Sequence, residues 1–583
     1  MSTNNPSSAS RIRYQPDDRL SATLSLGLGF QIAVLSIAGI ILIPTVVMRA
    51  ADATEAYLSW AVCTAVAVGG AATILQAVRI GRIGMGYILA MGPSAAFIAV
   101  CITAVAEGGP AMLATLAVIT SLVPLVLSYR LSLFQRILTP TVAGTVIMLI
   151  PITVMPAILN LLSATPPGTL VLSAPLSALA TIIIISGIAL KATGALRLWA
   201  PVIGVVVGSV IGGFFGLYDT GRVAEASWIG IPTNEWPGFD LDFGPTFWAL
   251  LPAFLLVAVI NTIRTISSAI AIQRISWRQS RAVDFRAVQG AVTVDGMSTL
   301  ISGLAGTMPN TAYTVGVSVT ELTGVGARSV GVATGAVFIA MAFLPKVLAS
   351  ILAIPGPVIA AYLTVLLSAL FVVGLKIVVQ DGIDYRNGMI VGIAFFVGVG
   401  FQSGLIFPEY ISEFAGGLLQ NGMSAGGFTA ILMTIFVELT EPRRSRIETE
   451  FDISALPKIR DFLGAFASRN GWDTAMSNRL DAAAEETLLT LIPQDEENRD
   501  RRRLRLTAHK EEGDAVLEFI AASGEENLQD RLALLNAQTD ELFSEREISL
   551  RLLQHLASSV RHQQYHDTDI VTVRVKTHHQ APP

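Results

Sequence analysis

Long stretches without a charged residue dominate the first three quarters of the chain and leave little choice of fold. The first of these runs extends from Leu20 to Met48. A helix needs about 20 apolar residues to cross a bilayer, so the pattern predicts membrane-spanning helices rather than a soluble enzyme. Further uncharged runs cover 56–78, 83–106, 108–129, 137–190, 198–218, 243–263, 296–320, 329–345, 347–375, 387–408 and 414–437.

The length rule also predicts how many segments cross the membrane. The run 137–190 is long enough for two spans, and the region 287–322 divides into two shorter elements near Pro309. This gives about fourteen segments of an all-α polytopic membrane protein.

Charge divides the chain into parts with different surroundings. Residues 1–441 contain 39 charged side chains, whereas residues 442–583 contain 44. We therefore predict an N-terminal tail (1–19), a transmembrane domain (20–442) and a C-terminal α/β domain (450–577) in water. When the spans alternate from an inside N-terminus, most Lys and Arg fall on the inner side, so both termini are predicted to be cytoplasmic. The first run is too long for a signal peptide, and we expect a retained multi-pass protein of the cell inner membrane.

Side-chain chemistry excludes several classes of function. All six His follow residue 441, and the two Cys, Cys63 and Cys101, lie in apolar runs without zinc-site spacing. The net charge of −5 gives no reason to expect nucleic-acid binding. We expect no cofactor, no metal and no enzymatic activity, and lipid bilayer and a small-molecule solute as the partners.

An internal repeat is the most informative motif. Pro93-Ser94-Ala95-Ala96-Phe97 and Pro309-Asn310-Thr311-Ala312-Tyr313 share the pattern Pro, small polar, small, Ala, aromatic, 216 residues apart. Two halves of seven spans would have opposite topology, each with a broken third segment, as in inverted-repeat secondary transporters. The alternative is a chance match, because Pro and Gly are frequent in membrane helices.

At these residues the chain resembles the nucleobase-ascorbate transporter family, the xanthine and uracil permeases. The matching stretches include Gly84 to Phe97, Asp295 to Tyr313 and Gly426 to Leu432, spread over about residues 20–440. The resemblance implies a fourteen-span fold with core and gate domains, usually dimeric, that moves nucleobases with protons or sodium.

The chain departs from the family at the positions that bind the base. The resemblance implies a Glu on the eighth span with Gly and Asp one turn later, where this chain has Asn261, Arg264 and Thr265. The tenth-span signature of Gln or Glu, Asn, any residue and Gly reads Val315, Gly316, Val317 and Ser318 here. The predicted substrate-binding residues are Ser94, Ala95, Phe97, Asn261, Arg264, Thr265, Thr311, Tyr313, Thr314, Val315, Gly316 and Ser318.

These side chains leave the solute and the coupling ion open. Asn261 can hydrogen-bond a base but cannot titrate, and it could equally form a structural bond between helices. Arg264 is expected to pair with Glu321 or to extend its head to the inner interface. With Arg264 and two helix N-termini at the site, an anion such as urate is favoured over uracil. Glu321 is the predicted proton-coupling residue.

Three functions remain consistent with the sequence. The first is a proton-coupled nucleobase permease that works by alternating access. The others are a transporter of another organic or inorganic anion on the same fold, and a nucleobase-binding membrane sensor that signals through residues 450–583.

The tail has the periodicity of a compact α/β domain. It resembles the ATPase-fold domain of bacterial anti-sigma serine kinases at Leu480 to Thr487 and Ile548 to Leu556, but Thr490 occupies the Mg-binding Asn position and the Gly-rich lid is missing. We expect a non-catalytic domain that could bind a cytoplasmic regulatory protein, or a solvated tail. The predicted helices are 456–468, 476–491 and 548–560, and the predicted strands are 504–507, 515–519 and 570–575.

Overall fold

The computed structural model separates into two compact units. The first contains Met1–Arg278 and Ala287–Leu439, and the second contains Gln279–Arg286 and Thr440–Pro583. The structure describes residues 12–131, 140–163, 165, 169–230, 235–279, 281–379, 385–407, 422–440, 445–492, 503–511, 513–521, 528–529, 545–566 and 568–576.

The first unit is built from apolar helices. Eight helices among the described residues are long and apolar enough to cross a membrane, or up to nine if the bent pair α12 (Arg328–Ala342) and α13 (Pro345–Leu352) is one span. The protein is therefore a multi-pass membrane protein. Parts of the predicted runs 137–190, 387–408 and 414–437 lie outside the described residues. The eight helices are α1 (Ala22–Ala50), α2 (Glu55–Val78), η2 with α3 (Ala95–Phe97 and Ile98–Tyr129), α5 (Pro140–Leu162), α6 (Ser173–Lys191), α7 (Ala195–Phe214), α9 (Pro245–Ile275) and α14 (Gly356–Val379).

These helices pack as two bundles. In the first bundle α1, α2 and α12 pack together and α3 packs against α9, which also contacts α11 (Val315–Thr323). In the second bundle α14 packs on α5, α6 and α7, and α15 (Tyr385–Gln402) packs on α5. The helix α17 (Gly422–Thr440) joins the second bundle, because Gly426 lies against Leu149 of α5 and Ala394 of α15.

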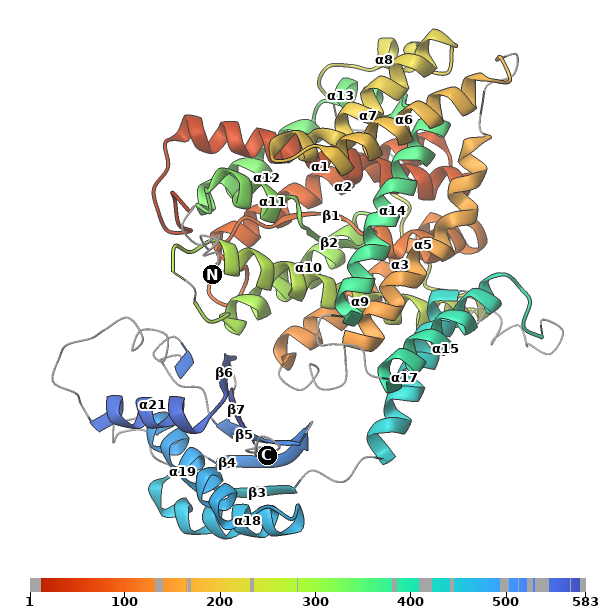
Figure 1. The fold of residues 1–583 in the computed structure, drawn as a ribbon. Helices are drawn as coiled ribbons and strands as arrows, with labels where there is room; N and C mark the ends of the chain where they lie inside the picture. Colours follow the sequence, from red (N-terminus) through yellow and green to blue (C-terminus); the bar gives the residue numbers. More distant parts are fainter. Residues whose placement is uncertain are drawn as a thin grey trace. The chain divides into compact units, whose positions relative to one another are not determined.

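Two short strands interrupt the helices of the first bundle. Strand β1 (Ala90–Pro93) precedes η2 and α3, and strand β2 (Asn310–Tyr313) lies between α10 (Phe285–Leu304) and α11. They pair antiparallel, and Figure 1 shows them side by side among the helices of the first unit. The boundary predicted between runs 83–106 and 108–129 corresponds to Gly109, whose φ of 76° breaks α3.

The second unit contains a five-stranded antiparallel sheet in the order β3-β4-β5-β7-β6. The strands are β3 (Ser445–Glu450), β4 (Arg503–Glu511), β5 (Asp514–Ala521), β6 (Ser559–Gln564) and β7 (Asp569–Val575), and the helices are η4 (Ile453–Ala455), α18 (Leu456–Arg469), α19 (Thr474–Leu491) and α21 (Glu545–Leu556). Alternate strand residues such as Leu506, Leu517 and Val573 share one core with the helices. Figure 1 shows the helices on one side of this sheet.

Two local predictions for this unit were wrong. The helix predicted over 548–560 ends at Leu556, and Ser559–Gln564 is strand β6, which pairs with β7. Strand β3 was not predicted, because Arg446 belongs to the basic cluster 443–446, which was assigned to a cytoplasmic flank. Its strand conformation depends on pairing with β4.

Candidate functional site

The candidate site is the place where β1 and β2 pair antiparallel, here named the strand crossing, which brings the two repeated motifs together. Pro93 pairs with Asn310, and the Ser94 amide donates to the Pro309 carbonyl at 2.9 Å. Gly92 is required here, since a Cβ would lie 2.7 Å from Cγ1 of Ile40. Each strand leads into a helix, so the positive N-terminal ends of η2–α3 and α11 follow directly from the crossing.

Asn261 connects the crossing to α9 and α10 through hydrogen bonds. Its Oδ1 accepts from the Ser94 hydroxyl at 2.7 Å, and its Nδ2 donates to the Asn310 carbonyl at 2.8 Å and to Oδ2 of Asp295 at 3.4 Å. All four residues are buried. The side-chain amide of Asn261 therefore bonds to other groups of the protein. This matches the structural hydrogen bond between helices that the sequence allowed as the second role of Asn261.

Several buried polar atoms around this network have no hydrogen-bond partner among the described residues. They are Oγ1 of Thr311, both side-chain polar atoms of Asn310, and Oδ1 of Asp295 and Oγ1 of Thr265, two residues that interact with each other. Leaving a buried donor or acceptor unpaired costs about 1–3 kcal/mol for each group.

Arg264 and Asp295 are the charged residues of the site. Arg264 is half-buried, and its electrostatic neighbours are Tyr313 and Asp295. Thr265 also lies beside the Asp295 carboxyl group. Glu321, predicted to pair with Arg264, is exposed on α11. The structure therefore brings Arg264 near Asp295 instead.

The aromatic residues predicted to stack on a ring are both engaged within the protein. The Phe97 ring is buried and lies 5.9 Å from the ring of Phe254 on α9. The Tyr313 hydroxyl donates to the Pro93 carbonyl at 2.8 Å, which ties β2 to the end of β1. These contacts support the strand crossing and leave neither ring as an open stacking face in this conformation.

The other predicted residues lie at or just beyond the crossing. Ala95 and Gly316 are buried, and a Cβ on Gly316 would lie 2.7 Å from the Ile88 carbonyl. Val315 and Ser318 are half-buried, whereas Thr314 is exposed. The structure brings Ser94, Asn261, Thr265 and Thr311 to the polar cluster but places Thr314 and Glu321 outside it.

Asp295 and Asn310 are two site residues that the list of candidates missed. Both stood in the motif block 295–313 that carries the family resemblance, but neither was selected. The detectable signal was Asp295 itself, an acidic residue near the start of the predicted run 296–320, where an ionisable group in a membrane segment is by default a functional candidate.

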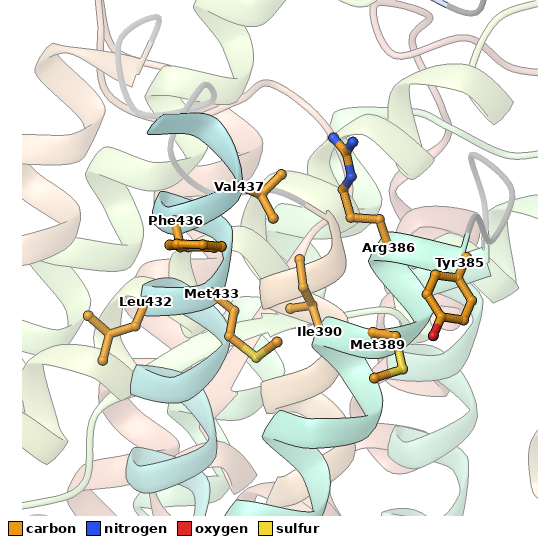
Figure 2. A pocket seen from close by; sticks show the side chains of 8 residues that line it. All are labelled: Tyr385, Arg386, Met389, Ile390, Leu432, Met433, Phe436 and Val437. Carbon is orange, nitrogen blue, oxygen red and sulfur yellow. The ribbon is translucent and has the colours of Figure 1, made fainter. Parts of the chain in front are cut away.

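A separate hollow between α15 and α17 differs in chemistry from this cluster. It has a volume of about 520 Å³, and Figure 2 shows its mostly apolar side chains. Such a lining offers few partners for a polar ring, so the strand crossing is the better candidate for solute binding. The lining residues are Tyr385, Arg386, Met389, Ile390, Leu432, Met433, Phe436 and Val437.

Interrupted membrane helices that meet at buried polar side chains are typical of secondary transporters. The chain belongs to the permease family named Xan_ur_permease, whose family model matches residues 24–405. It is therefore a permease and not an enzyme.

Relatives named as xanthine or uric acid permeases align with about two thirds to three quarters of the chain. The xanthine permease XanP of Escherichia coli K12 is 26% identical over 382 residues, which are 63% of this chain and 81% of XanP. The uric acid permease PucK of Bacillus subtilis is 24% identical over 434 residues, 72% of this chain and 97% of PucK. A xanthine permease of Bacillus subtilis is 23% identical over 437 residues, 74% of this chain and 97% of the relative.

Proposed function

We propose that this protein is a proton-coupled secondary transporter of oxidised purine bases of the xanthine and urate type. The observation that carries the proposal is the buried cluster of unpaired donors and acceptors where the two broken helices meet. The relatives named as xanthine and uric acid permeases support the choice of solute.

Recognition of the base is assigned to Asn310. Its side-chain amide supplies one acceptor and two donors, which match the carbonyl and N–H groups along the edge of a xanthine or urate ring. Asn261 acts as a positioning residue, because its own hydrogen bonds hold the Asn310 backbone and Ser94 in place. Thr311 and Thr265 supply further hydroxyls to the ring.

Proton coupling is assigned to Asp295. Of the acidic side chains in the described part of the first unit, Asp295 alone is buried. An ionised carboxylate at that depth needs a compensating partner, which the nearby Arg264 supplies. When an anionic solute pairs with Arg264, Asp295 takes up a proton and keeps the site close to neutral. Solute and proton then cross together.

Alternating access is assigned to motion of the first helix bundle, which carries the site, against the second. This assignment is supported by the packing, since α1, α2, α3, α9, α11 and α12 pack mainly on one another, with smaller contacts to the second bundle, in which α5, α6, α7 and α15 pack mainly around α14 and α5. Fourteen spans in a 7+7 inverted repeat are supported by the pairing of the two repeated motifs, in which Pro93 pairs with Asn310 and the Ser94 amide donates to the Pro309 carbonyl.

The wider organisation follows from the same proposal. Both termini and the domain at 450–577 lie in the cytoplasm, and the protein works in the plasma membrane as a homodimer. The domain at 450–577 is free of catalytic activity and serves regulation.

Uptake into proteoliposomes tests the proposal. Labelled xanthine, urate and uracil are offered with and without an inward proton gradient, and gradient-driven accumulation of xanthine or urate is the expected result. Accumulation of another anion alone would replace the solute, whereas tight xanthine binding without flux by folded protein would indicate a sensor and reject the transporter.

A further inference from the structure

Two of the connections between the helix bundles lie against each other within the first unit. After α7 the Leu217 amide donates back to the Gly212 carbonyl at 2.9 Å, and the chain then forms α8 (Thr220–Glu225) on its way to α9. The other connection is α13, which joins α12 to α14. The helix α8 packs on α13, and α13 packs on α1 and α12 of the first bundle (Figure 1). Both connections must therefore adapt when one bundle moves against the other.

The helix α1 determines on which side of the membrane these connections lie. It is long enough to span the bilayer, begins at Ala22 after the N-terminal tail and ends at Ala50, just before Glu55 opens α2. In the proposed topology the tail is cytoplasmic, so the Ala50 end of α1 is on the outer side. We call this end of the first unit the outer face.

Contacts across the outer face join the segment after α7 to the first bundle. Arg222 of α8 forms an ion pair with Glu55 in the first turn of α2, with 2.7 Å between Nη2 and Oε2. The Tyr218 hydroxyl donates to the Ser350 carbonyl of α13 at 2.7 Å. We call the Arg222–Glu55 pair the outer latch, because it connects a segment that follows a helix of the second bundle to a helix of the first.

Neighbouring groups hold the two charges of the outer latch in place. Asp219 caps α8 by accepting from the Arg222 amide at 3.0 Å. Arg49, in the last turn of α1, donates to the Leu352 carbonyl of α13 at 2.9 Å and has Glu55 and Arg222 among its electrostatic neighbours. The Arg222 side chain is 21% exposed and that of Glu55 is 66% exposed. A pair of this kind adds little to overall stability, but it can shift the balance between two conformations of similar energy.

The outer latch is suited to gating because its two charges belong to parts that move apart. Glu55 moves with α2 and the first bundle, whereas Arg222 is tied to α7 through the turn at Leu217. We infer that the Arg222–Glu55 pair holds the carrier closed on the outer face and breaks each time the site opens to that side. The inference rests on the proposed function, because it requires alternating access between the bundles.

Xanthine transport from each side of the membrane tests the outer latch in the full-length protein. Cells without other purine permeases report KM at the outer face, and inverted membrane vesicles report KM at the inner face. Glu55→Gln and Arg222→Gln should each lower KM in cells about threefold, because apparent affinity rises with the fraction of carrier that is open to the solute. The double variant should resemble either single variant, and KM in inverted vesicles should not fall.

Matched variants separate the latch from general effects of charge. Arg222→Lys keeps the charge and should match wild type, and Glu55→Arg combined with Arg222→Glu should restore KM toward the wild-type value. Asp17→Asn removes a different ion pair, which joins the tail to Arg328 of α12 at the other end of the first bundle. It should leave KM in cells unchanged.

Unchanged or raised KM in the Gln variants, falls that multiply in the double variant, or an equal fall in Asp17→Asn would overturn the inference. If the Gln variants do not fold, Arg222→Lys allows a second measurement, because a carbodiimide can couple the new amine to the Glu55 carboxylate. Coupled protein should lose xanthine uptake relative to wild type treated in the same way, and uptake that continues would refute the latch. Absent uptake by untreated wild type would instead refute the proposed function, on which the latch rests.

Discussion

Replacing Asp295 with Asn is the change that most directly tests the proposed mechanism. Asn keeps the size of the side chain and the hydrogen bond from Asn261 but cannot take up a proton. Because one buried acidic side chain is present in the described part of the first unit, the stoichiometry should be one proton for each solute. One pH unit then drives accumulation by about 1.4 kcal/mol, a factor of about ten.

The assay measures the steady-state accumulation of labelled xanthine in proteoliposomes at several pH gradients, with the membrane potential held at zero. Wild-type protein should accumulate solute about tenfold more for each pH unit. Asp295→Asn should abolish this dependence while exchange of internal for external xanthine continues, because the hydrogen bonds to the base do not require the proton.

Glu321→Gln is the matched control and separates the two carboxylates. Glu321 is exposed and should leave the pH dependence unchanged. A full pH dependence in Asp295→Asn would refute the assignment, and loss of the dependence in Glu321→Gln would return proton coupling to the residue expected from the sequence.

Three further predictions concern the site and its support. Asn261→Ala and Ser94→Ala should each lower the free energy of unfolding by about 1–3 kcal/mol. Their effects should not add in the double variant, because the two residues share one hydrogen bond. Thermal unfolding in detergent measures these losses, and additive losses would contradict the network. Arg264→Gln should weaken binding of urate about tenfold more than binding of uracil. Calorimetry at one pH measures both affinities, and an equal loss for the two solutes would mean that the guanidinium does not face the solute. Phe97→Ala should lower the free energy of unfolding by about 3–5 kcal/mol, because it leaves a cavity beside Phe254. The KM for xanthine uptake should stay near the wild-type value, and a large rise in KM would mean that the ring contacts the solute.

The membrane part of the fold could be predicted from local properties of the chain. Uncharged runs such as Leu20 to Met48 can be placed stably only in a bilayer or a core, and their length selects the bilayer. Pro93 and Pro309 cannot donate a backbone hydrogen bond within a helix, so an interruption at each motif was also predictable. The structure has short strands at both places.

The strands and helix ends of the second unit were less predictable. The sequence of β6 has weak alternation, and its place is set by pairing with β7. A segment next to an amphipathic helix can read as its continuation, because the periodicity of a few residues does not include the partner strand.

The composition of the site was decided by tertiary structure. Sequence alone selected Asn261 and Ser94 and placed both in membrane segments, Ser94 in an interrupted one, but their hydrogen bond joins residues 167 positions apart. Asp295 and Asn310 became site residues because α10 and β2 bring them to the same buried cluster, while Glu321 on the exposed side of α11 was left out. Helix formation and membrane insertion depend on neighbouring residues. The pairing of buried polar groups depends on the register of β1 with β2, two strands far apart in the sequence, and only the packed fold determines that register.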